Sequence, residues 1–221
     1  MPSATSPSST PPRKKVLFFT NAEHGQASVF LATTYSLLLL DPTVEIHFAS
    51  FKPIRSSVEE TYGQAVKDAV SSSTTTASCP PSAKCPSSTS STATHKNTPR
   101  PVVWHEIHAT DYMTALLRPE HKLILHVWLG PGLLTTPLAL WSIMRLVQPW
   151  TGQEFVQIFE ETLRIVREVR PNVIVIDPIL SPAISACIDR GLRFCVLAPN
   201  TIKDFALALQ PSGQMFWKYP A

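Results

Sequence analysis

The chain has 221 residues, 44% of them hydrophobic, and a net charge of +3. This length and this composition are those of a globular protein with one sizeable core. Because the basic residues are scattered, they exclude the concentrated basic face of a nucleic-acid-binding protein, and we expect no nucleic-acid partner.

The first element is predicted just after the N-terminus. Residues 1–13 are rich in Ser, Pro and Thr without an apolar core, so we expect a disordered tail and no secretory signal. A continuous apolar run at 16–19 predicts a strand buried on both faces of a parallel sheet. A mostly polar loop follows at 20–27, and Ser28 is predicted to cap the next helix.

His24 lies in this loop, directly before the expected helix. A strand-loop-helix unit brings its loop to the carboxyl edge of the sheet, where open α/β folds bind ligands. The positive end of the helix dipole disfavours imidazolium, so we expect His24 to stay neutral and able to accept a proton. The alternative is a loop histidine that hydrogen-bonds to the backbone and has no further role.

A strand and a second helix are predicted after the first helix ends at Asp41. The strand, at 44–50, alternates apolar and polar residues, with His47 on the polar side, where we expect it to be solvated. A capping box at 56–59 predicts that the second helix starts there and extends to about Val70.

Residues 71–101 interrupt all periodicity with a Ser/Thr/Pro-rich stretch. This composition cannot bury enough apolar surface to offset the entropy of ordering, so we expect a disordered insertion that loops out of the domain. A phosphorylation-controlled arm is the alternative. A third strand is predicted at 102–107 and a short helix at 111–117.

The stretch 123–145 is strongly apolar, but three residues at 130–132 (Gly-Pro-Gly) and Pro137 interrupt it. A membrane-spanning helix needs about 20 predominantly apolar residues. We therefore expect short segments that line an apolar pocket, with peripheral membrane contact as the second interpretation.

A capping box at 151–154 predicts a helix with one buried stripe at three-and-four spacing. The stripe consists of Phe155, Ile158, Phe159, Thr162, Ile165, Val166 and Val169. Its charged neighbours are expected on the solvated side: Glu161, Arg164, Arg167 and Glu168.

A buried strand at 173–176 then places Asp177 at its carboxyl end. A helix is predicted to follow, with Ser181 as its cap, Pro182 as its first residue and Gly191 as its end. The remaining predicted elements are a strand at 193–197, a turn at 199–201 and a last helix at 202–209.

Because strands and helices alternate along the chain, the predicted fold is α/β with a mostly parallel sheet. Three loops are expected at the same carboxyl edge, at 21–27, 177–180 and 199–201. Asp177 on one of them can hold the His24 imidazole in one tautomer and stabilise it once protonated. The alternative for Asp177 is a carboxylate that only caps the adjacent helix.

The chain shows no signature of a bound metal or cofactor. Its cysteines, Cys79, Cys85, Cys187 and Cys195, lack metal-ligand spacing with a histidine. We expect no metal and no cofactor, small buried thiols, and a reducing, cytoplasmic location. A nucleotide-binding oxidoreductase is the least supported function, because no G-x-G-x-x-G or Walker-type loop is present.

Four segments together resemble the amino-terminal half of a fungal-type family 1 UDP-glycosyltransferase. They are residues 23–32, 173–178, 197–201 and 210–220. The resemblance spans residues 15–221, apart from the insertion. In that family the histidine after the first strand is the catalytic base and an aspartate that ends a later strand orients it; His24 and Asp177 match these positions.

The details of the first loop match the family in part. Ala32 corresponds to the alanine that many members have eight residues after the histidine. Glu23 and Ala27 stand where many members have a glycine and a proline, which bears on the conformation of the loop.

The resemblance implies a Rossmann-like, doubly wound parallel sheet that forms one lobe of a two-lobed GT-B architecture. The lobe at 14–221 would bind the acceptor, and the donor-binding lobe with its Trp-, His- and Gln-rich signature is absent from the chain. The assigned catalytic residues are His24 and Asp177, and the assigned acceptor-binding residues are Asn21, Gln26, Trp128 and Asn200.

The favoured hypothesis is the acceptor-binding half of an enzyme that transfers a sugar from a UDP-sugar to a hydroxyl group. The apolar stretch 123–144 predicts a small lipophilic acceptor such as a sterol, a lipid or an aromatic metabolite. Because no loop offers a diphosphate cradle, we expect the chain alone to lack turnover and to be marginally soluble. The alternative is a non-catalytic, stand-alone α/β module that binds a ligand or a partner through residues 123–146.

Overall fold

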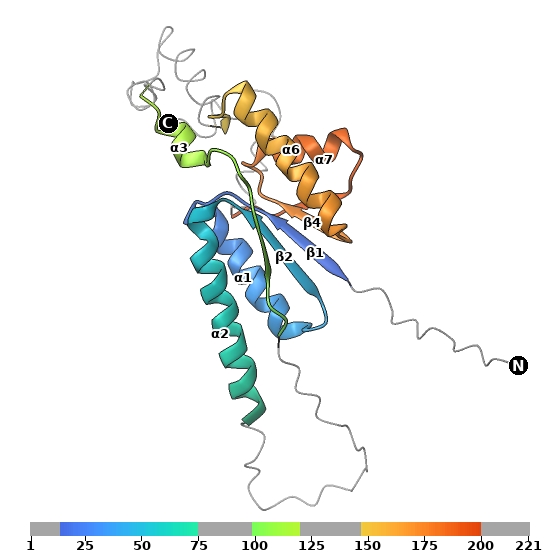
Figure 1. The fold of residues 1–221 in the computed structure, drawn as a ribbon. Helices are drawn as coiled ribbons and strands as arrows, with labels where there is room; N and C mark the ends of the chain where they lie inside the picture. Colours follow the sequence, from blue (N-terminus) through green and yellow to red (C-terminus); the bar gives the residue numbers. More distant parts are fainter. Residues whose placement is uncertain (1–13, 75–98, 120–146, 200–221) are drawn as a thin grey trace, which may run out of the picture.

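Parallel strands form the centre of the molecule (Figure 1). The computed structural model describes residues 14–74, 99–119 and 147–199. The strands in these ranges are β1 (Lys15–Phe19), β2 (Glu45–Ser50), β3 (Val103–Glu106), β4 (Val173–Ile176) and β5 (Phe194–Val196). They pair in the order β3-β2-β1-β4-β5, and every pairing is parallel. The predicted α/β class with a parallel sheet is therefore confirmed.

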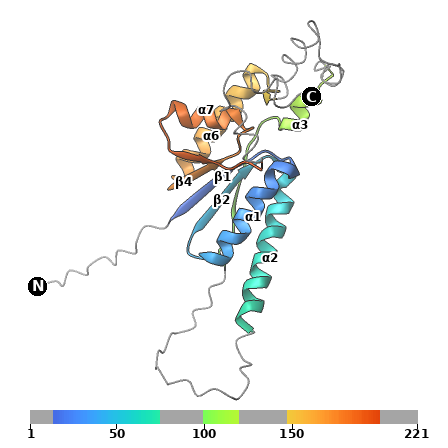
Figure 2. The same ribbon diagram turned by 180° about the vertical axis from the view of Figure 1, so that it is seen from behind.

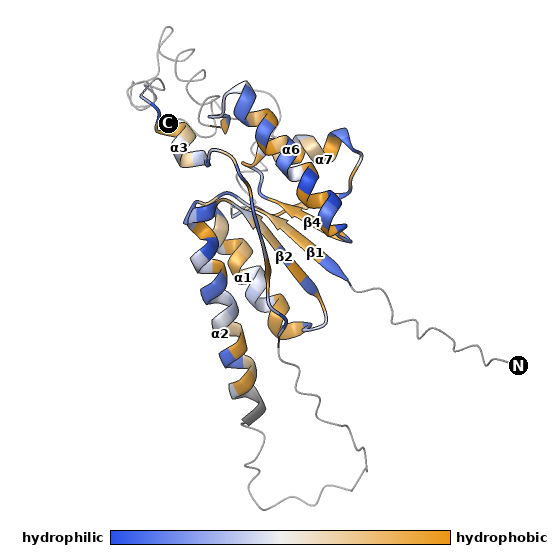
Figure 3. Cartoon of the chain, in the orientation of Figure 1, coloured by the Kyte–Doolittle hydropathy of each residue, from blue (hydrophilic) through white to orange (hydrophobic). Residues whose placement is uncertain are grey.

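Helices cover both faces of this sheet (Figure 1 and Figure 2). One face carries α1 (His24–Leu40) and α2 (Arg55–Thr74), and the other carries α6 (Gly152–Val169) and α7 (Ser181–Asp189). A short 3-10 helix, η1 (Lys52–Ile54), precedes α2, and α3 (Tyr112–Leu116) follows β3. The strands and the inward faces of the helices are hydrophobic, as Figure 3 shows.

The side chains of β1 alternate between the two cores. Leu17 and Phe19 are buried in the core that includes residues of α6 and α7, whereas Phe18 is buried in the core that includes residues of α1 and α2. This alternation is the ordinary consequence of strand geometry, in which successive side chains point to opposite faces. A continuous apolar run was the right signal, because both faces of β1 are covered.

The order of the strands places a topological switch point beside β1. The chain adds β2 and β3 on one side of β1 and then β4 and β5 on the other. In doubly wound sheets, ligands bind in the crevice outside the carboxyl ends of the strands at this point. Here the switch point lies between the ends of β1 and β4, where Phe19 pairs with Ile176.

Two helix ends agree with the predicted signals, at Thr151 and Gly191, and Asp111 adds a cap that was not predicted. Thr151 and Glu154 form a reciprocal capping box at the start of α6. The Asp111 carboxylate accepts a hydrogen bond from the Thr114 N–H at the start of α3. Gly191 follows the end of α7 with a φ of +60°, a conformation that glycine adopts without strain.

Three predicted helix starts are wrong. The Glu23 carbonyl already accepts hydrogen bonds from Gln26 and Ala27, so α1 begins at His24 and Ser28 lies inside it. The Ser28 hydroxyl donates to the Gly25 carbonyl instead of capping the helix.

The helices α2 and α7 also begin before their predicted caps. Because η1 runs directly into α2, that helix begins at Arg55, one residue before the predicted cap at Ser56. The N-cap of α7 is Leu180, so Ser181 is a helical residue whose hydroxyl donates to Gln148 Oε1, and Pro182 follows it inside the helix. In each case the backbone turn closes earlier than the side-chain pattern indicates.

Phe30 anchors α1 to the sheet. Its side chain is fully buried and meets the Phe18 ring edge-on, with centroids 6.0 Å apart and an interplanar angle of 86°. Replacing Phe30 by Ala is expected to lower the free energy of unfolding by about 3–5 kcal/mol, because it removes the buried ring and leaves a cavity. Urea unfolding monitored by circular dichroism measures this loss. The control is Leu40→Ala on the same helix, where the side chain is 82% exposed and we expect little change.

His47 is buried, so the prediction that it is solvated is wrong. Its side chain is part of a polar chain between two neighbouring strands: His47 Nδ1 lies 2.9 Å from His105 Nε2, and His47 Nε2 lies 2.9 Å from Glu45 Oε1. The two rings stack with centroids 5.2 Å apart. The partners assign the tautomers, with His105 donating to His47 and His47 donating to Glu45.

The histidine pair predicts a loss of stability in acid. Burial is the largest effect and lowers the pKa of both His47 and His105. The Glu45 and Glu168 carboxylates raise the pKa of His47, and Lys15 lowers it. Glu168 also raises the pKa of His105, and Arg164 lowers it. The neutral rings stabilise the fold above the unfolded pKa of about 6.5, and this contribution is lost as pH falls through the lowered folded values. We expect the free energy of unfolding to fall in this window.

Denaturant titrations from neutral to mildly acidic pH measure this loss, and the double variant His47→Gln/His105→Gln is the comparison. Its stability should change less over the same window. An equal acid loss in the variant and the wild type would contradict the assignment to the pair.

Cys187 and Cys195 lie in different environments. Cys187 is buried in α7, and burial raises the pKa of its thiol to about 11, so this thiol is confirmed as a buried one. Cys195 is exposed, which corrects the prediction of a buried thiol. The reason is its place on β5, which pairs on one side only within the described sheet.

Several predictions fall on residues that the structure does not describe. They concern most of the 71–101 insertion, the 123–145 stretch and the elements from 200 onward. Within the described ranges, no helix combines the length and the apolar composition needed to cross a membrane.

Candidate functional site

The carboxyl ends of β1 and β4 bring two predicted residues to the switch point. Directly after β1 come Thr20 and Asn21, and directly after β4 comes Asp177. All three are completely buried. The sequence placed Asp177 correctly at a strand end, and the sheet order brings it beside the first loop.

The Asp177 carboxylate ties the ends of these two strands together. Its Oδ2 accepts hydrogen bonds from Thr20 Oγ1 and from the Asn21 backbone N–H, both at 3.3 Å. Its Oδ1 accepts from the Ile179 N–H at 2.9 Å, in the turn before α7. The N-cap residue of α7 is Leu180, so Asp177 is not the cap of that helix.

Burial raises the pKa of Asp177, and the hydrogen bonds from Ile179, Asn21 and Thr20 oppose this effect. The result is a carboxyl group that is held in one orientation and is less acidic than an exposed aspartate. Carboxyl groups with a perturbed pKa occur at functional sites and also in structural hydrogen-bond networks.

His24 is the first residue of α1 and is exposed. Among the described residues, its ring takes part in no hydrogen bond or ion pair, and none joins it to Asp177. The imidazole is therefore open to a ligand at the positive end of the α1 dipole. The pairing of His24 with Asp177 stays a prediction, as does the catalytic role of each.

Polar atoms without a described partner flank His24 in the chain. Both side-chain atoms of Asn21, the Glu23 Oε2 and the Gln26 Oε1 are buried and have no hydrogen-bond partner among the described residues. Each such group costs about 1–3 kcal/mol when it is left unpaired. Native proteins retain few of them, so these atoms call for a partner such as water, an ion or a ligand.

Glu23 is the member of this cluster that sequence reasoning did not assign to the site. Burial, the largest effect, raises the pKa of Glu23, and the nearby carboxylates of Asp111 and Asp177 raise it further. The backbone N–H groups of Glu23 and Met113 act in the opposite direction. Its position directly before His24, where the resembled family usually has glycine, was the signal that could have identified it.

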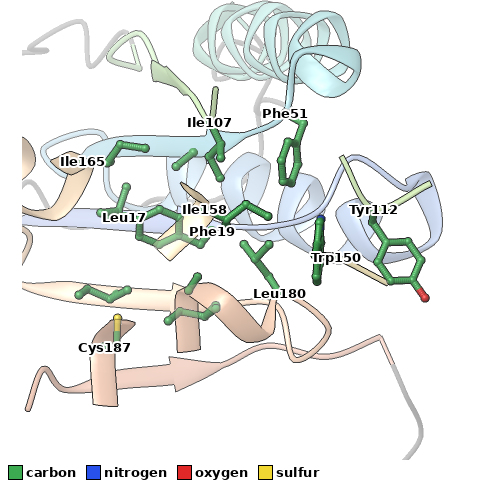
Figure 4. Packing of buried hydrophobic residues seen from close by; sticks show 14 of the residues in the cluster. Leu17, Phe19, Phe51, Ile107, Tyr112, Trp150, Ile158, Ile165, Leu180 and Cys187 are labelled. Atoms are coloured by element: carbon green, nitrogen blue, oxygen red, sulfur yellow. The ribbon is translucent and has the colours of Figure 1, made fainter. Parts of the chain in front are cut away.

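Two buried aromatic residues form an apolar wall within the core (Figure 4). Tyr112 and Trp150 meet edge to face with centroids 5.7 Å apart, and the Trp150 Nε1–H donates to the Thr110 carbonyl at 2.9 Å. Leu180 lies beside Trp150 in the same core. The pKa of Tyr112 is raised by burial and then by the charges of Glu23 and Asp177, so this ring lies close to the polar loop.

Glu154 holds Thr110, the residue whose carbonyl accepts the hydrogen bond from Trp150. Its carboxylate pairs with Arg118 and also accepts from Thr110 Oγ1 at 2.7 Å. The Arg118 guanidinium is the main reason that the pKa of Glu154 is lowered to about 2. The sequence signal that was missed is Trp150 directly before the cap Thr151, a position where an apolar residue often packs on the helix start.

The remaining assigned residues cannot be placed. Trp128 and Asn200 lie outside the described residues. In the described part of the chain, no group of three or more metal-ligating side chains converges. The structure joins Asp177 to Thr20 and Asn21 at the start of the first loop, and Glu23, His24 and Gln26 follow in the chain.

No protein-family model matches the chain. Over 210 residues it is 28% identical to glycosyltransferase sdnJ of Sordaria araneosa, a match that covers 95% of this chain and 36% of that protein. Among solved structures, it is similar to the glycotransferase of kitacinnamycin, with a TM-score of 0.46 and 10% sequence identity. That match covers 90% of this chain and 35% of the other, and so low a score carries no conclusion. The chain thus spans about a third of the length of the proteins it matches.

Proposed function

We propose that this chain is the acceptor-binding part of a UDP-glycosyltransferase of the family 1 type, one lobe of a GT-B architecture. Similarity to a protein named a glycosyltransferase, over nearly the whole chain, supports glycosyl transfer in general. The observation that carries the proposal is His24, exposed at the start of α1 and flanked in the chain by buried polar atoms that lack partners among the described residues. The UDP-sugar would bind to a donor lobe outside this chain.

In this proposal, His24 is the general base. An acceptor hydroxyl attacks the anomeric carbon of the sugar, a new C–O bond forms there, and the bond to UDP breaks on the opposite face. The imidazole accepts the proton of the hydroxyl, and UDP leaves as an anion, so the reaction inverts the anomeric centre. A base within hydrogen-bond reach is needed because the oxygen of a neutral hydroxyl group is a poor nucleophile. Such a base contributes about 10²–10⁴-fold to the rate.

Asp177 would act on His24 and not on the substrate. Its carboxylate is anchored by Thr20, Asn21 and Ile179. When the acceptor displaces solvent, a rotation of the His24 ring toward this carboxylate would fix its tautomer and offset its developing charge. The catalytic hydrogen bonds of a ligand-free site often form only in the complex.

The acceptor would contact the polar loop and the apolar stretch 123–145. The Asn21 amide and the Gln26 Oε1 have no partner among the described residues. The rings of Tyr112 and Trp150 are only 8% and 6% exposed, so they would support the site from the core, and we assign Trp128 and Asn200 to the same site. We further propose a cytoplasmic location, with peripheral membrane contact through residues 123–145.

Calorimetric titration of the purified chain tests this function. We expect weak binding of a water-soluble sterol analogue and no measurable binding of UDP, because the donor diphosphate would be held elsewhere. The variant Gln26→Met should weaken sterol binding about 3-fold to 10-fold, since it removes one hydrogen bond of about 0.5–1.5 kcal/mol. The control is Gln153→Met, at an exposed position of α6.

Two outcomes would count against the proposal. Tight UDP binding, or sugar transfer by this chain alone, would overturn the half-enzyme assignment.

The alternative function is a stand-alone α/β module that binds a lipophilic ligand or a partner through residues 123–146. Transcripts whose coding sequence continues past Ala221 into a donor lobe would favour the enzyme over the module.

A further inference from the structure

A hollow lies at the ends of the strands that are opposite to His24. It has a volume of about 580 Å³ and lies where α6 ends and β4 begins. In Figure 1 this is the end of the sheet at which β1 starts. Three arginines and three apolar side chains account for most of its lining: Arg167, Arg170, Arg193, Val166, Ile174 and Leu192.

The arginines of this hollow have no carboxylate partner in the described part of the chain. No acidic residue lines the hollow, and none of its three guanidinium groups takes part in an ion pair with a described residue. The only hydrogen bond of the Arg167 side chain within those residues is its donation to the Leu163 carbonyl. Elsewhere the pattern differs: Arg164 on the same helix pairs with both Glu161 and Glu168.

The backbone at Arg170 supports a role for its side chain. This residue ends α6 with φ 51° and ψ 61°, a left-handed conformation in which glycine or asparagine is the usual residue. A larger residue at such a position costs about 1–2 kcal/mol. The carbonyl end of α6 favours a cation there. It does not account for Arg193, which comes from the segment before β5.

We propose that this hollow binds a phosphate group carried on an apolar body. Guanidinium groups match phosphate oxygens with paired, charge-assisted hydrogen bonds. The apolar lining, in which Val166 and Leu192 are partly exposed, suits a hydrocarbon portion of the same ligand. A membrane phospholipid and a free phosphorylated amphiphile share this chemistry. Because the hollow and His24 lie at opposite ends of the strands, its occupant would not compete with an acceptor.

The test uses the full chain and two probes. The first probe is vesicles of phosphatidylcholine in which about a fifth of the lipid is phosphatidic acid, with pure phosphatidylcholine vesicles as the reference. The second probe is hexyl phosphate, measured by calorimetry. We expect binding of at least one probe and no binding of the reference vesicles.

The double variant Arg170→Gly/Arg193→Ser should weaken that binding at least about tenfold. Glycine suits the left-handed backbone at 170, and Arg193 is exposed, so the variant is expected to fold. The matched control, Arg55→Gln/Lys67→Gln on α2, removes the same net charge from exposed positions and should bind like the wild type.

Each result decides the proposal. Vesicle binding that the double variant loses identifies a membrane lipid as the source, and loss confined to hexyl phosphate identifies a free ligand. Absence of binding to both probes would overturn the proposal. So would an equal loss in the α2 control, because it would show that net charge alone attracts the phosphate.

Discussion

Replacing His24 by Ala, in a glycosyltransferase that carries this chain as its acceptor-binding lobe, is expected to lower kcat by about 10²–10⁴-fold, the usual contribution of a general base. The fold should not change, because the ring is exposed and takes part in no hydrogen bond with the described residues. Steady-state kinetics with a UDP-sugar and a sterol acceptor measure the effect, and circular dichroism checks the fold.

Two comparisons make this experiment decisive. His24→Gln keeps a hydrogen-bonding side chain without a basic nitrogen, so its kcat should be as low as that of the alanine variant. His108→Ala changes another exposed histidine, which lies beyond β3 at the edge of the described sheet, and should leave kcat near the wild-type value. Wild-type turnover in His24→Ala would remove the base from the proposed mechanism.

The strands were predictable from the sequence because burial on both faces leaves a direct signal. β1 and β4 appear as unbroken apolar runs, and the structure confirms each to within one residue. The start of α6 was predictable for a different reason: Thr151 and Glu154 satisfy each other's backbone groups locally, so no distant contact has to be known.

Local signals failed where a neighbouring element decides the structure. Ser28 has the right chemistry for a cap, but the turn that starts α1 closes at Glu23. His47 is polar and sits in an alternating strand, yet β3 brings His105 to within 2.9 Å of it and makes a buried position tolerable. Neither fact can be read from the residues adjacent to Ser28 or His47 in the chain.

In the candidate site, too, the sequence predicts the positions along the chain but not the contacts between elements. The sequence could place His24 and Asp177 near the carboxyl edge, because each follows a predicted strand. It could not show that Asp177 bonds to Thr20 and Ile179, since these contacts depend on the order of the strands. The roles of both residues therefore stay predictions that kinetics must test.

Replacing Asp177 by Ala is expected to lower the free energy of unfolding by about 3 kcal/mol or more. The substitution leaves the Thr20 hydroxyl and the N–H groups of Asn21 and Ile179 without their acceptor, and each buried unpaired group costs about 1–3 kcal/mol. Asp177→Asn should cost less, because its one carbonyl oxygen can still accept from Ile179. Urea unfolding at neutral pH measures both losses.

The pH dependence separates the charge of Asp177 from its hydrogen bonds. Because burial raises the folded pKa above the unfolded value of about 3.9, the fold favours the protonated form. Stability is therefore lost as pH rises from the unfolded pKa through the folded pKa, and the loss is complete above that range. Asp177→Asn lacks this contribution, so the stability of the wild type relative to Asp177→Asn should fall as pH rises over this window; a similar contribution from Glu23, whose pKa is also raised, is present in both proteins. The control is Asp189→Asn, which removes an exposed carboxylate of α7 and leaves Asp177 and Glu23 in place. If Asp177→Ala unfolds at the same urea concentration as the wild type, the carboxylate does not tie β1 to β4, and the structural role assigned to it is wrong.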